Sequence, residues 1–245
     1  MQDDKFIEGT VMKGKDLKGY TLCKILSEDM NLRGFQYKIG MNEYVKPNIL
    51  GGDYREGFRF YLIEDICRYL SHGTKLAMVS VPDEEDVGIG YKEFSAYRMA
   101  IEKVLQLNEI LDKVSGWECL ILNGADITAD NSYAVRWAVL NGYPEVVEFL
   151  HGNGADITAN KNAAIRYAAA GGHLEIVKYL HENGADITAM DNAAVKFAAE
   201  EGHLETVKYL HKNGANIMAE DAYAIRFAEA NGHTDVVEYL KANMQ

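Results

Sequence analysis

The sequence predicts a mostly α fold, in which a solenoid of short helical repeats follows a small α+β domain. The first observation is a recurring segment: Gly-Ala-Asp-Ile-Thr-Ala stands at residues 124–129, 154–159 and 184–189, and a close variant follows at 214–219. The second is that each 30-residue period contains two helical patterns, whereas residues 1–90 do not repeat and contain strand-like patterns. Self-similarity at a fixed period is the signature of stacked repeats.

Each repeat predicts two helices joined by a glycine turn. In the second repeat, residues 163–170 are rich in alanine, and Gly171 and Gly172 follow them. Residues 174–180 place apolar side chains on one broad helical face, and Asn-Gly at 183–184 ends that pattern. Glycine and asparagine commonly follow the last turn of a helix. The pattern therefore predicts helix-turn-helix units connected by loops.

Three further features of the repeat point to a family. Gly-His at 172–173 precedes the second helix, Ile-Val at 176–177 and Leu180 lie within it, and Asn-Gly-Ala-Asp follows at 183–186. Over residues 95–245 the chain therefore resembles the ankyrin-repeat proteins. This resemblance implies an extended surface that binds other proteins. Ankyrin units usually run to about 33 residues. The 30-residue units here predict short loops and little of the family's β-hairpin finger surface.

Both ends of such an array need caps, because terminal repeats expose one stacking face. Residues 91–124 are interpreted as a degenerate helix pair that caps the N-terminal end. The last repeat has Glu229 where inner repeats have alanine, and Thr234 where they have leucine, which predicts a C-terminal cap. The four repeats are expected at 125–154, 155–184, 185–214 and 215–245.

The N-terminal region, residues 1–90, predicts a small α+β domain. Apolar, aromatic and β-branched runs indicate strands, and the apolar face of Ile66, Cys67 and Leu70 indicates a helix. An acidic run at 83–86 follows, and we expect the domain boundary there. The expected strands are 20–26, 35–39, 58–61 and 75–81, and the expected helix is 63–72.

Part of this region has a second resemblance. Residues 34–42, Pro47, Gly-Gly at 51–52 and residues 76–82 are similar to the N-terminal domain of ankyrin-repeat proteins from giant amoeba-infecting viruses of the mimivirus type. The resemblance implies a viral source, and with it a host or viral protein as the partner. It implies no activity, since members of this group are named by their repeats alone.

Two rows of side chains on the first helices are the candidate partner-binding residues. One is a basic ladder, and the other is an aromatic ladder that follows it by one position, about 100° round the helix. On a concave face, an apolar strip of this kind would suit a partner peptide or helix, and the bases would suit an acidic segment. The basic ladder is Arg136, Arg166, Lys196 and Arg226, and the aromatic ladder is Trp137, Tyr167, Phe197 and Phe227.

Each ladder also has a purely structural explanation. The bases could pair with carboxylates such as Asp126, Asp156 or Asp186, or they could bond loop carbonyls, because like charges in a row need compensation. The aromatic side chains could pack against the neighbouring repeat. The sequence leaves both explanations open beside the binding role.

The histidines and cysteines do not indicate chemistry. Six of the seven histidines recur with the repeat period and form no close pair on one helix, so no metal site is expected. Cys23, Cys67 and Cys119 lie in no C-x-x-C motif, and we expect them to be small core residues in a reducing compartment. Aromatic residues of the second helices are expected to pack, namely Tyr179, Tyr209 and Tyr239.

Composition limits the function classes. The chain has a net charge of -12, which repels phosphate backbones, so no nucleic-acid partner is expected. The apolar runs are too short to span a bilayer, and the N-terminus lacks the pattern of a secretory signal. We therefore expect no membrane partner and a cytoplasmic location, which for a viral protein is the host cytoplasm. The sequence does not predict the oligomeric state.

No catalytic motif is found, so no catalytic residue and no cofactor are expected. The predicted function is a non-catalytic scaffold or adaptor for protein–protein interaction. One alternative is a nucleotide-handling enzyme in the N-terminal domain, and another is recruitment of a ubiquitin-ligase scaffold by that domain, with the array selecting the substrate in each case. The candidate residues for the enzyme are Arg33, Tyr37, Tyr54, Arg55, Arg59 and Glu64.

Overall fold

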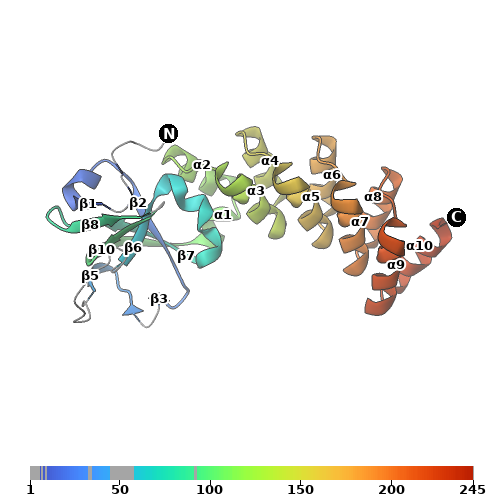
Figure 1. Cartoon of the computed structure of the whole chain (residues 1–245), viewed down its shortest axis with the longest axis horizontal. Coiled ribbons are helices and arrows are strands. Elements are labelled where there is room, and N and C mark those ends of the chain that lie inside the picture. Colours follow the sequence, from blue (N-terminus) through green and yellow to red (C-terminus); the bar gives the residue numbers. More distant parts are fainter. Residues whose placement is uncertain are drawn as a thin grey trace. The chain divides into compact units, whose positions relative to one another are not determined.

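The computed structural model describes residues 6, 8, 10–32, 35–44, 58–90 and 93–244 (Figure 1). Contacts between Cα atoms divide the chain into two compact units, Met1–Asp126 and Ile127–Gln245. The first unit combines a sheet with short helices, and the second is an array of helix pairs. This confirms the predicted fold class.

The first unit is built on an antiparallel sheet of eight strands. The strand order is β1-β8-β9-β6-β2-β7-β10-β5, so strands that are distant in the chain lie side by side. A separate hairpin pairs β3 (Asn31–Leu32) with β4 (Phe35–Gln36). The strands of the large sheet are β1 (Val11–Lys13), β2 (Leu22–Leu26), β5 (Gly40–Glu43), β6 (Phe58–Leu62), β7 (Lys75–Ser80), β8 (Asp86–Ile89), β9 (Phe94–Ala96) and β10 (Arg98–Gln106).

Alternation along β6 explains how this sheet builds its core. Phe58, Phe60 and Leu62 are buried, whereas the two residues between them are only half-buried. Successive side chains of a strand point to opposite faces, so one face of β6 supplies the core. The ring of Phe60 stacks on Phe94 of the neighbouring strand, with ring centroids 5.7 Å apart.

Two expected elements differ in the structure: the helix at 63–72 is wound more tightly, and the strand at 35–39 is shorter. The helical segment consists of two 3-10 helices, η2 (Ile63–Arg68) and η3 (Leu70–His72), and a third, η1 (Gly14–Leu17), follows β1. The strand at Phe35 ends after Gln36. Short 3-10 helices such as η3 are common connectors, whereas a run as long as the six residues of η2 is uncommon because the hydrogen-bond geometry of this helix is poorer.

The sheet continues past the expected boundary at 83–86. This acidic run is a turn that leads into β8, and β9 and β10 complete the same sheet. The acidic side chains have partners inside the unit: Glu85, which is buried, accepts a hydrogen bond from Arg98 on β10 at 2.7 Å. The charges therefore mark a turn within the unit and not a linker between domains.

The expected helix pair at 91–124 is wrong for residues 94–106, which form β9 and most of β10. It is correct for α1 (Leu107–Leu111) and α2 (Val114–Leu122), which belong to the first unit. Met99 and Ile101 are buried on β10, which pairs with β5 and β7. Sheet pairing thus overrides the helix propensity of the alanine, glutamate, lysine and leucine residues in this segment.

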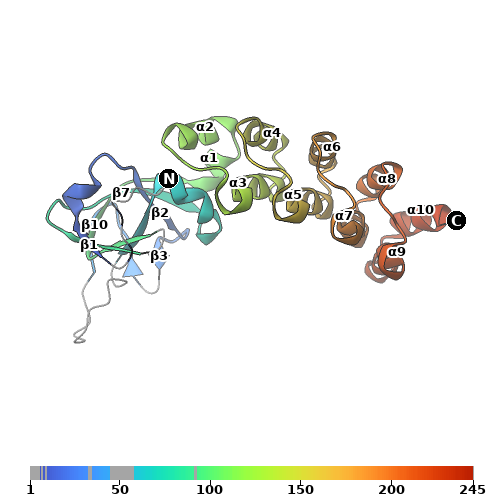
Figure 2. The same cartoon turned by 45° about the horizontal axis from the view of Figure 1, so that its top comes forward.

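The second unit consists of four helix pairs in two rows (Figure 2). First helices of neighbouring repeats pack more closely than second helices do, so the row of first helices forms the inner side of the array. Corresponding helices begin 30 residues apart, and both helices of the last repeat end one residue later than their counterparts. The first helices are α3 (Ala129–Leu140), α5 (Ala159–Ala170), α7 (Ala189–Glu200) and α9 (Ala219–Asn231), and the second helices are α4 (Pro144–Gly152), α6 (Leu174–Glu182), α8 (Leu204–Lys212) and α10 (Thr234–Asn243).

Each first helix opens with a left-handed turn of three residues. In α5 these are Asn160, Lys161 and Asn162, whose φ angles are 52°, 57° and 57°. For most side chains this conformation costs roughly 1–2 kcal/mol per residue, and asparagine and aspartate tolerate it best. These two residue types fill most of the corresponding positions in the four repeats. Residues 127–244 contain no strand, in line with the expected loss of the β-hairpin finger.

The third residue of this turn joins each repeat to the next. Ser132 Oγ accepts a hydrogen bond from the backbone N–H of Asp156 at 2.8 Å. Asn162 Oδ1 accepts the equivalent bond from Asp186 at 2.9 Å, and Asn192 Oδ1 accepts it from Asn216 at 2.7 Å. The bonds satisfy one loop amide per repeat, so they fix the loop of one unit on the helix of the unit before it.

The last repeat differs from the inner repeats as expected for a cap. Glu229 is exposed and pairs with Lys241 at 2.8 Å, whereas Ala169 and Ala199 at the same position are fully buried. Ala222 occupies the position of Asn162 and has no side-chain acceptor for the amide of a following repeat. The outer side of α9 and α10 is therefore polar where the inner repeats stack.

Candidate functional site

The aromatic ladder lies on the inner row of helices. Trp137, Tyr167, Phe197 and Phe227 are all half-buried, so each is partly packed and partly open to solvent. Their immediate neighbours are consistent with this intermediate position. Trp137 contacts Tyr143, with ring centroids 5.7 Å apart, and Phe227 stacks on Tyr223 at 3.9 Å. The ladder is thus neither pure core nor a row of free rings.

Two members of the basic ladder have carboxylate partners. Arg136 donates to the backbone carbonyl of Asn131 at 2.5 Å and reaches the carboxylate of Asp130 at 3.4 Å. Lys196 is almost fully buried and pairs with Glu220 of the next repeat at 2.8 Å. Both carboxylates belong to the left-handed turns, so these two positive charges are neutralised within the array.

Among the described residues, the other two members hydrogen-bond only a loop carbonyl. Arg166 Nη2 donates to the carbonyl of Asn160 at 3.3 Å, and Arg226 Nη2 donates to the carbonyl of Glu220 at 3.3 Å. The structural explanation by loop carbonyls therefore describes part of the ladder. The carboxylates of Asp156 and Asp186 were possible partners of the bases under the structural explanation. They instead accept hydrogen bonds from Thr158 and Thr188, in each case from the backbone N–H at 2.8 Å and from the hydroxyl at 2.7 Å.

The hydrogen bonds of these loop aspartates stabilise the turn that precedes the first helix of their repeat. Hydrogen bonds from Thr158 hold the pKa of the Asp156 carboxyl below its usual value. In the last repeat Asn216 takes the same place and accepts from the N–H of Met218 at 2.9 Å. Aspartate or asparagine at this position thus serves the same structural purpose, and within the described residues neither aspartate forms an ion pair with a ladder base.

The second helices carry a contact that the sequence did not predict. The hydroxyl of Tyr179 lies 2.8 Å from Nδ1 of His151 in the preceding repeat. The same bond, at 2.9 Å, joins His181 to Tyr209 and His211 to Tyr239. The expected packing of these tyrosines is correct, since all three are half-buried, but the histidines also engage them. The constant separation of 28 residues is the sequence signal that could have revealed the pairs.

The enzyme candidates in the first unit do not converge on one another in the residues that the structure describes. Tyr37 is buried in the core against Phe35 and Phe58, and burial raises its pKa to about 12. Arg59 pairs with Glu93 at 3.1 Å, and Glu64 is exposed. The remaining candidates, Arg33, Tyr54 and Arg55, lie outside the described residues.

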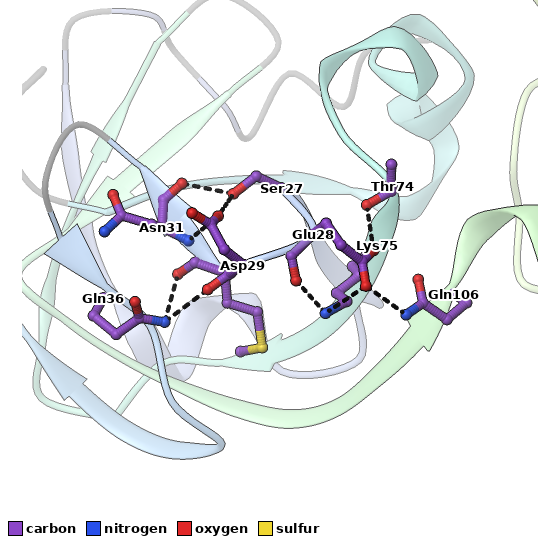
Figure 3. A network of polar contacts seen from close by, with 9 residues as sticks. Ser27, Glu28, Asp29, Asn31, Gln36, Thr74, Lys75 and Gln106 are labelled. Atoms are coloured by element: carbon purple, nitrogen blue, oxygen red, sulfur yellow. Dashed lines mark hydrogen bonds and ion pairs between the residues drawn. The ribbon is translucent and has the colours of Figure 1, made fainter.

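A cluster of polar side chains in this unit surrounds the turn after β2 (Figure 3). Glu28 accepts from the hydroxyl of Thr74 at 2.9 Å and from the amide of Gln106 at 3.3 Å, and it pairs with Lys75. The hydrogen bond from Thr74 is the main reason that the pKa of Glu28 lies below its usual value. Because these groups bond one another, the cluster ties the turn to β7 and β10 and presents no set of free catalytic groups.

The cysteines divide into two kinds. Cys23 and Cys67 are buried as expected, and burial raises the pKa of Cys67 to about 12. Cys119 on α2 is exposed, so its expected place in the core is wrong. The reason is its position on the helix, since the buried face of α2 is formed by Trp117 and Leu120. Trp117 is fully buried and donates its indole N–H to the carbonyl of Leu111 at 2.9 Å.

Within the described residues no helix has the length and apolar character needed to cross a bilayer. Nor do these residues contain three or more histidine, cysteine or acidic side chains grouped so that they could hold a metal ion.

Comparison with known proteins points to one family. A family model described as ankyrin repeats in three copies matches residues 113–191 and 135–221. A protein of Acanthamoeba polyphaga mimivirus that is named for its ankyrin repeats is 33% identical over 132 residues, which are 53% of this chain and 40% of that protein. An uncharacterized protein of the same virus is 33% identical over 129 residues, which are 51% of this chain and 92% of that protein. The match thus spans less than half of the first relative and nearly all of the second. Together with the helix pairs of the second unit, these matches show that the chain belongs to the ankyrin-repeat proteins.

Proposed function

We propose that this chain is a non-catalytic scaffold that binds a host or viral protein through the inner row of first helices. Ankyrin repeats are generally modules for protein–protein interaction, and the relatives are mimivirus proteins. The observation that supports this surface most directly is the aromatic ladder, with one half-buried ring in each of the four repeats.

The physical argument rests on what a half-buried ring can offer a partner. The packed side of the ring already restricts its motion. Binding a partner therefore costs less side-chain entropy at a half-buried ring than at a fully exposed side chain. Its open side supplies apolar area, and aromatic residues are enriched among those that contribute most to binding energy. The ring spacing is set by the repeat, which suits an extended partner segment.

The viral relatives also lead us to infer that the protein acts in the cytoplasm of an infected host cell. The partner is then a protein of that cell or of the virus. The proposal assigns no catalytic residue and no cofactor to either unit.

Site-specific photo-crosslinking tests the proposed surface. A photoreactive amino acid replaces Tyr167 on the inner row in one variant and Glu175, which is exposed on α6, in the other. Each variant is irradiated in a lysate of Acanthamoeba cells infected with a mimivirus, after circular dichroism has confirmed its fold. We expect a discrete crosslinked protein from position 167 and none from position 175. Crosslinking from position 175 alone would place the binding surface on the second helices and refute the proposal.

A further inference from the structure

The left-handed turn of the second repeat differs in charge from the other three. In the first, third and fourth repeats this turn contains at least one acidic residue beside the basic ladder, namely Asp130, Asp191, Glu220 and Asp221. The second repeat has Asn160, Lys161 and Asn162 at these positions. The turn of the second repeat therefore has the same backbone conformation as the other three turns, but it contains no acidic residue and one additional basic residue.

The ladder base of this repeat has unused hydrogen-bond donors. Arg166 makes one long bond, from Nη2 to the carbonyl of Asn160 at 3.3 Å. Its Nε is buried and has no partner, and it is the one buried side-chain nitrogen or oxygen atom of the described residues in that state. Arg136, in the repeat before, uses both terminal nitrogens and meets a carboxylate. A guanidinium offers five N–H donors in a fixed plane, and unpaired donors at a buried position are costly.

No carboxylate in the array neutralises this group. Within the described residues neither Arg166 nor Lys161 has an ion pair, whereas Arg136 and Lys196 have one each. The nearest loop carboxylates in the sequence, Asp156 and Asp186, accept hydrogen bonds at Oδ1 from Thr158 and Thr188, and within the described residues they form no ion pair with Arg166 or Lys161. Since the whole chain carries a net charge of -12, two cations without an ion pair in the first helix of one repeat, Lys161 in its turn and Arg166 beyond it, are a local exception.

From these contacts we propose that Arg166 and Lys161 form a binding site for the carboxylate of an aspartate or glutamate side chain of the partner. This inference rests on the proposed function and assigns the chemistry of one contact within it. Because Nε is buried, the two terminal nitrogens of Arg166 would take the two carboxylate oxygens, and Lys161 would add a second positive charge. The Arg166 guanidinium lies 5.9 Å from the ring centroid of Tyr167, and Phe197 stands at the same position one repeat on. A partner segment with an acidic residue next to apolar ones therefore fits this part of the face.

A defined probe tests this site without knowledge of the natural partner. Purified full-length chain is titrated with a fluorescent random copolymer of glutamate and tyrosine, and with a copolymer of glutamine and tyrosine as the uncharged control. We expect the acidic copolymer to bind, although the chain has a net charge of -12, and the uncharged copolymer to bind much more weakly. Removing the charge-assisted bonds with Arg166→Gln should weaken binding about tenfold or more, and Arg166→Lys should weaken it less.

Arg226 supplies the matched control, because it occupies the same ladder position and makes the same single carbonyl bond, but beside Glu220 and Asp221. Arg226→Gln should change binding by less than about twofold. Lys161→Asp is a second test on an exposed residue that leaves the packing untouched, and it should abolish binding by giving the second repeat the acidic turn of the others. Equal losses from Arg166→Gln and Arg226→Gln, unchanged binding by Lys161→Asp, or no binding of the acidic copolymer would overturn the proposal. A protein crosslinked from position 167 by a chain that fails to bind the copolymer would leave the proposed function standing and remove only this inference.

Discussion

Nδ1 of His181 and the hydroxyl of Tyr209 are 2.9 Å apart and join the second helices of two neighbouring repeats. The same pair of residue types recurs at the two other junctions of the array, so one hydrogen bond repeats along its outer row. Neighbouring helices pack less closely in this row than in the inner row. A polar bond at this place therefore contributes to stacking where apolar packing is less extensive.

We expect this bond to couple the two repeats energetically. Tyr209→Phe removes the hydroxyl and keeps the ring, and His181→Ala removes the other partner. In a double-mutant cycle on the free energy of unfolding, the coupling between the two positions should be about 1 kcal/mol. Urea denaturation followed by circular dichroism measures it. Additive effects of the two substitutions would show that the hydroxyl and the imidazole do not stabilise the junction.

Asn162 should be more sensitive to substitution than its exposure indicates. Asn162→Ala removes the acceptor for the N–H of Asp186 and places alanine in a left-handed conformation, so we expect a loss of roughly 1–3 kcal/mol in the free energy of unfolding. Asn162→Ser is the matched control, because Ser132 makes the equivalent bond in the first repeat. Thermal and urea unfolding of both variants check this. The serine variant should lose less than the alanine variant, and the reverse order would contradict the assigned hydrogen bond.

Asp156 gives the array a defined dependence on pH. Its pKa in the folded chain is lowered by hydrogen bonds from Thr158, so the carboxylate is favoured by folding. The stability it contributes is present above the ordinary carboxyl pKa of about 3.9 and is lost as the pH falls through the lower folded value. Asp156→Asn keeps an acceptor, as Asn216 does in the last repeat, and cannot titrate.

The prediction is a difference between two pH profiles. When the free energy of unfolding is measured between neutral pH and the acid range, the wild-type chain should lose more stability below the ordinary carboxyl pKa than Asp156→Asn loses. Parallel profiles for the two proteins would show that the hydrogen bonds of Thr158 do not favour the ionised form of Asp156.

Thiol reactivity should separate the cysteines. Cys119 is exposed and is expected to react with a thiol reagent at neutral pH. Cys23 and Cys67 are buried, and burial raises the pKa values of both thiols, so they should react only after unfolding. Mass spectrometry after brief labelling of the native chain identifies the modified residue. Rapid labelling of Cys67 in the folded chain would contradict its assigned burial.

The array could be predicted from the sequence because its helices repeat with a fixed period and end at glycine or asparagine. The strand β10 could not be predicted in this way. The segment that contains Met99 and Ile101 consists largely of good helix formers, and its strand conformation depends on β5 and β7, which come from other parts of the chain. The left-handed turns were also not predicted. Methionine and glutamate rarely adopt a positive φ, but Met190 and Glu220 do so because the backbone of the repeat imposes this conformation.

The candidate site was predicted in part. Counting one base and one aromatic residue per repeat located both ladders, but not which bases are neutralised. That distinction depends on residues of the turn, Asp130 for Arg136 and Glu220 for Lys196, and a comparison of the four turns in the sequence could have found it. Predicting the tyrosine–histidine hydrogen bonds would have required knowing how the second helices of neighbouring repeats align. The helical pattern within one repeat does not contain that information.

The central claim is that the aromatic ladder of the inner row binds the partner. The most direct measurement is the affinity of the crosslinked partner, once identified, for the intact chain and for a variant with Trp137→Ala, Tyr167→Ala and Phe197→Ala. A control variant replaces exposed residues of the second helices by Glu145→Ala, Glu175→Ala and Glu205→Ala, and circular dichroism confirms that each variant is folded. We predict at least a hundredfold loss of affinity for the ladder variant, since each buried aromatic anchor contributes roughly 1 kcal/mol or more, and little change for the control. Equal binding by a folded ladder variant and the intact chain, or a ladder variant that unfolds, would contradict the claim and assign the aromatic ladder to packing within the array.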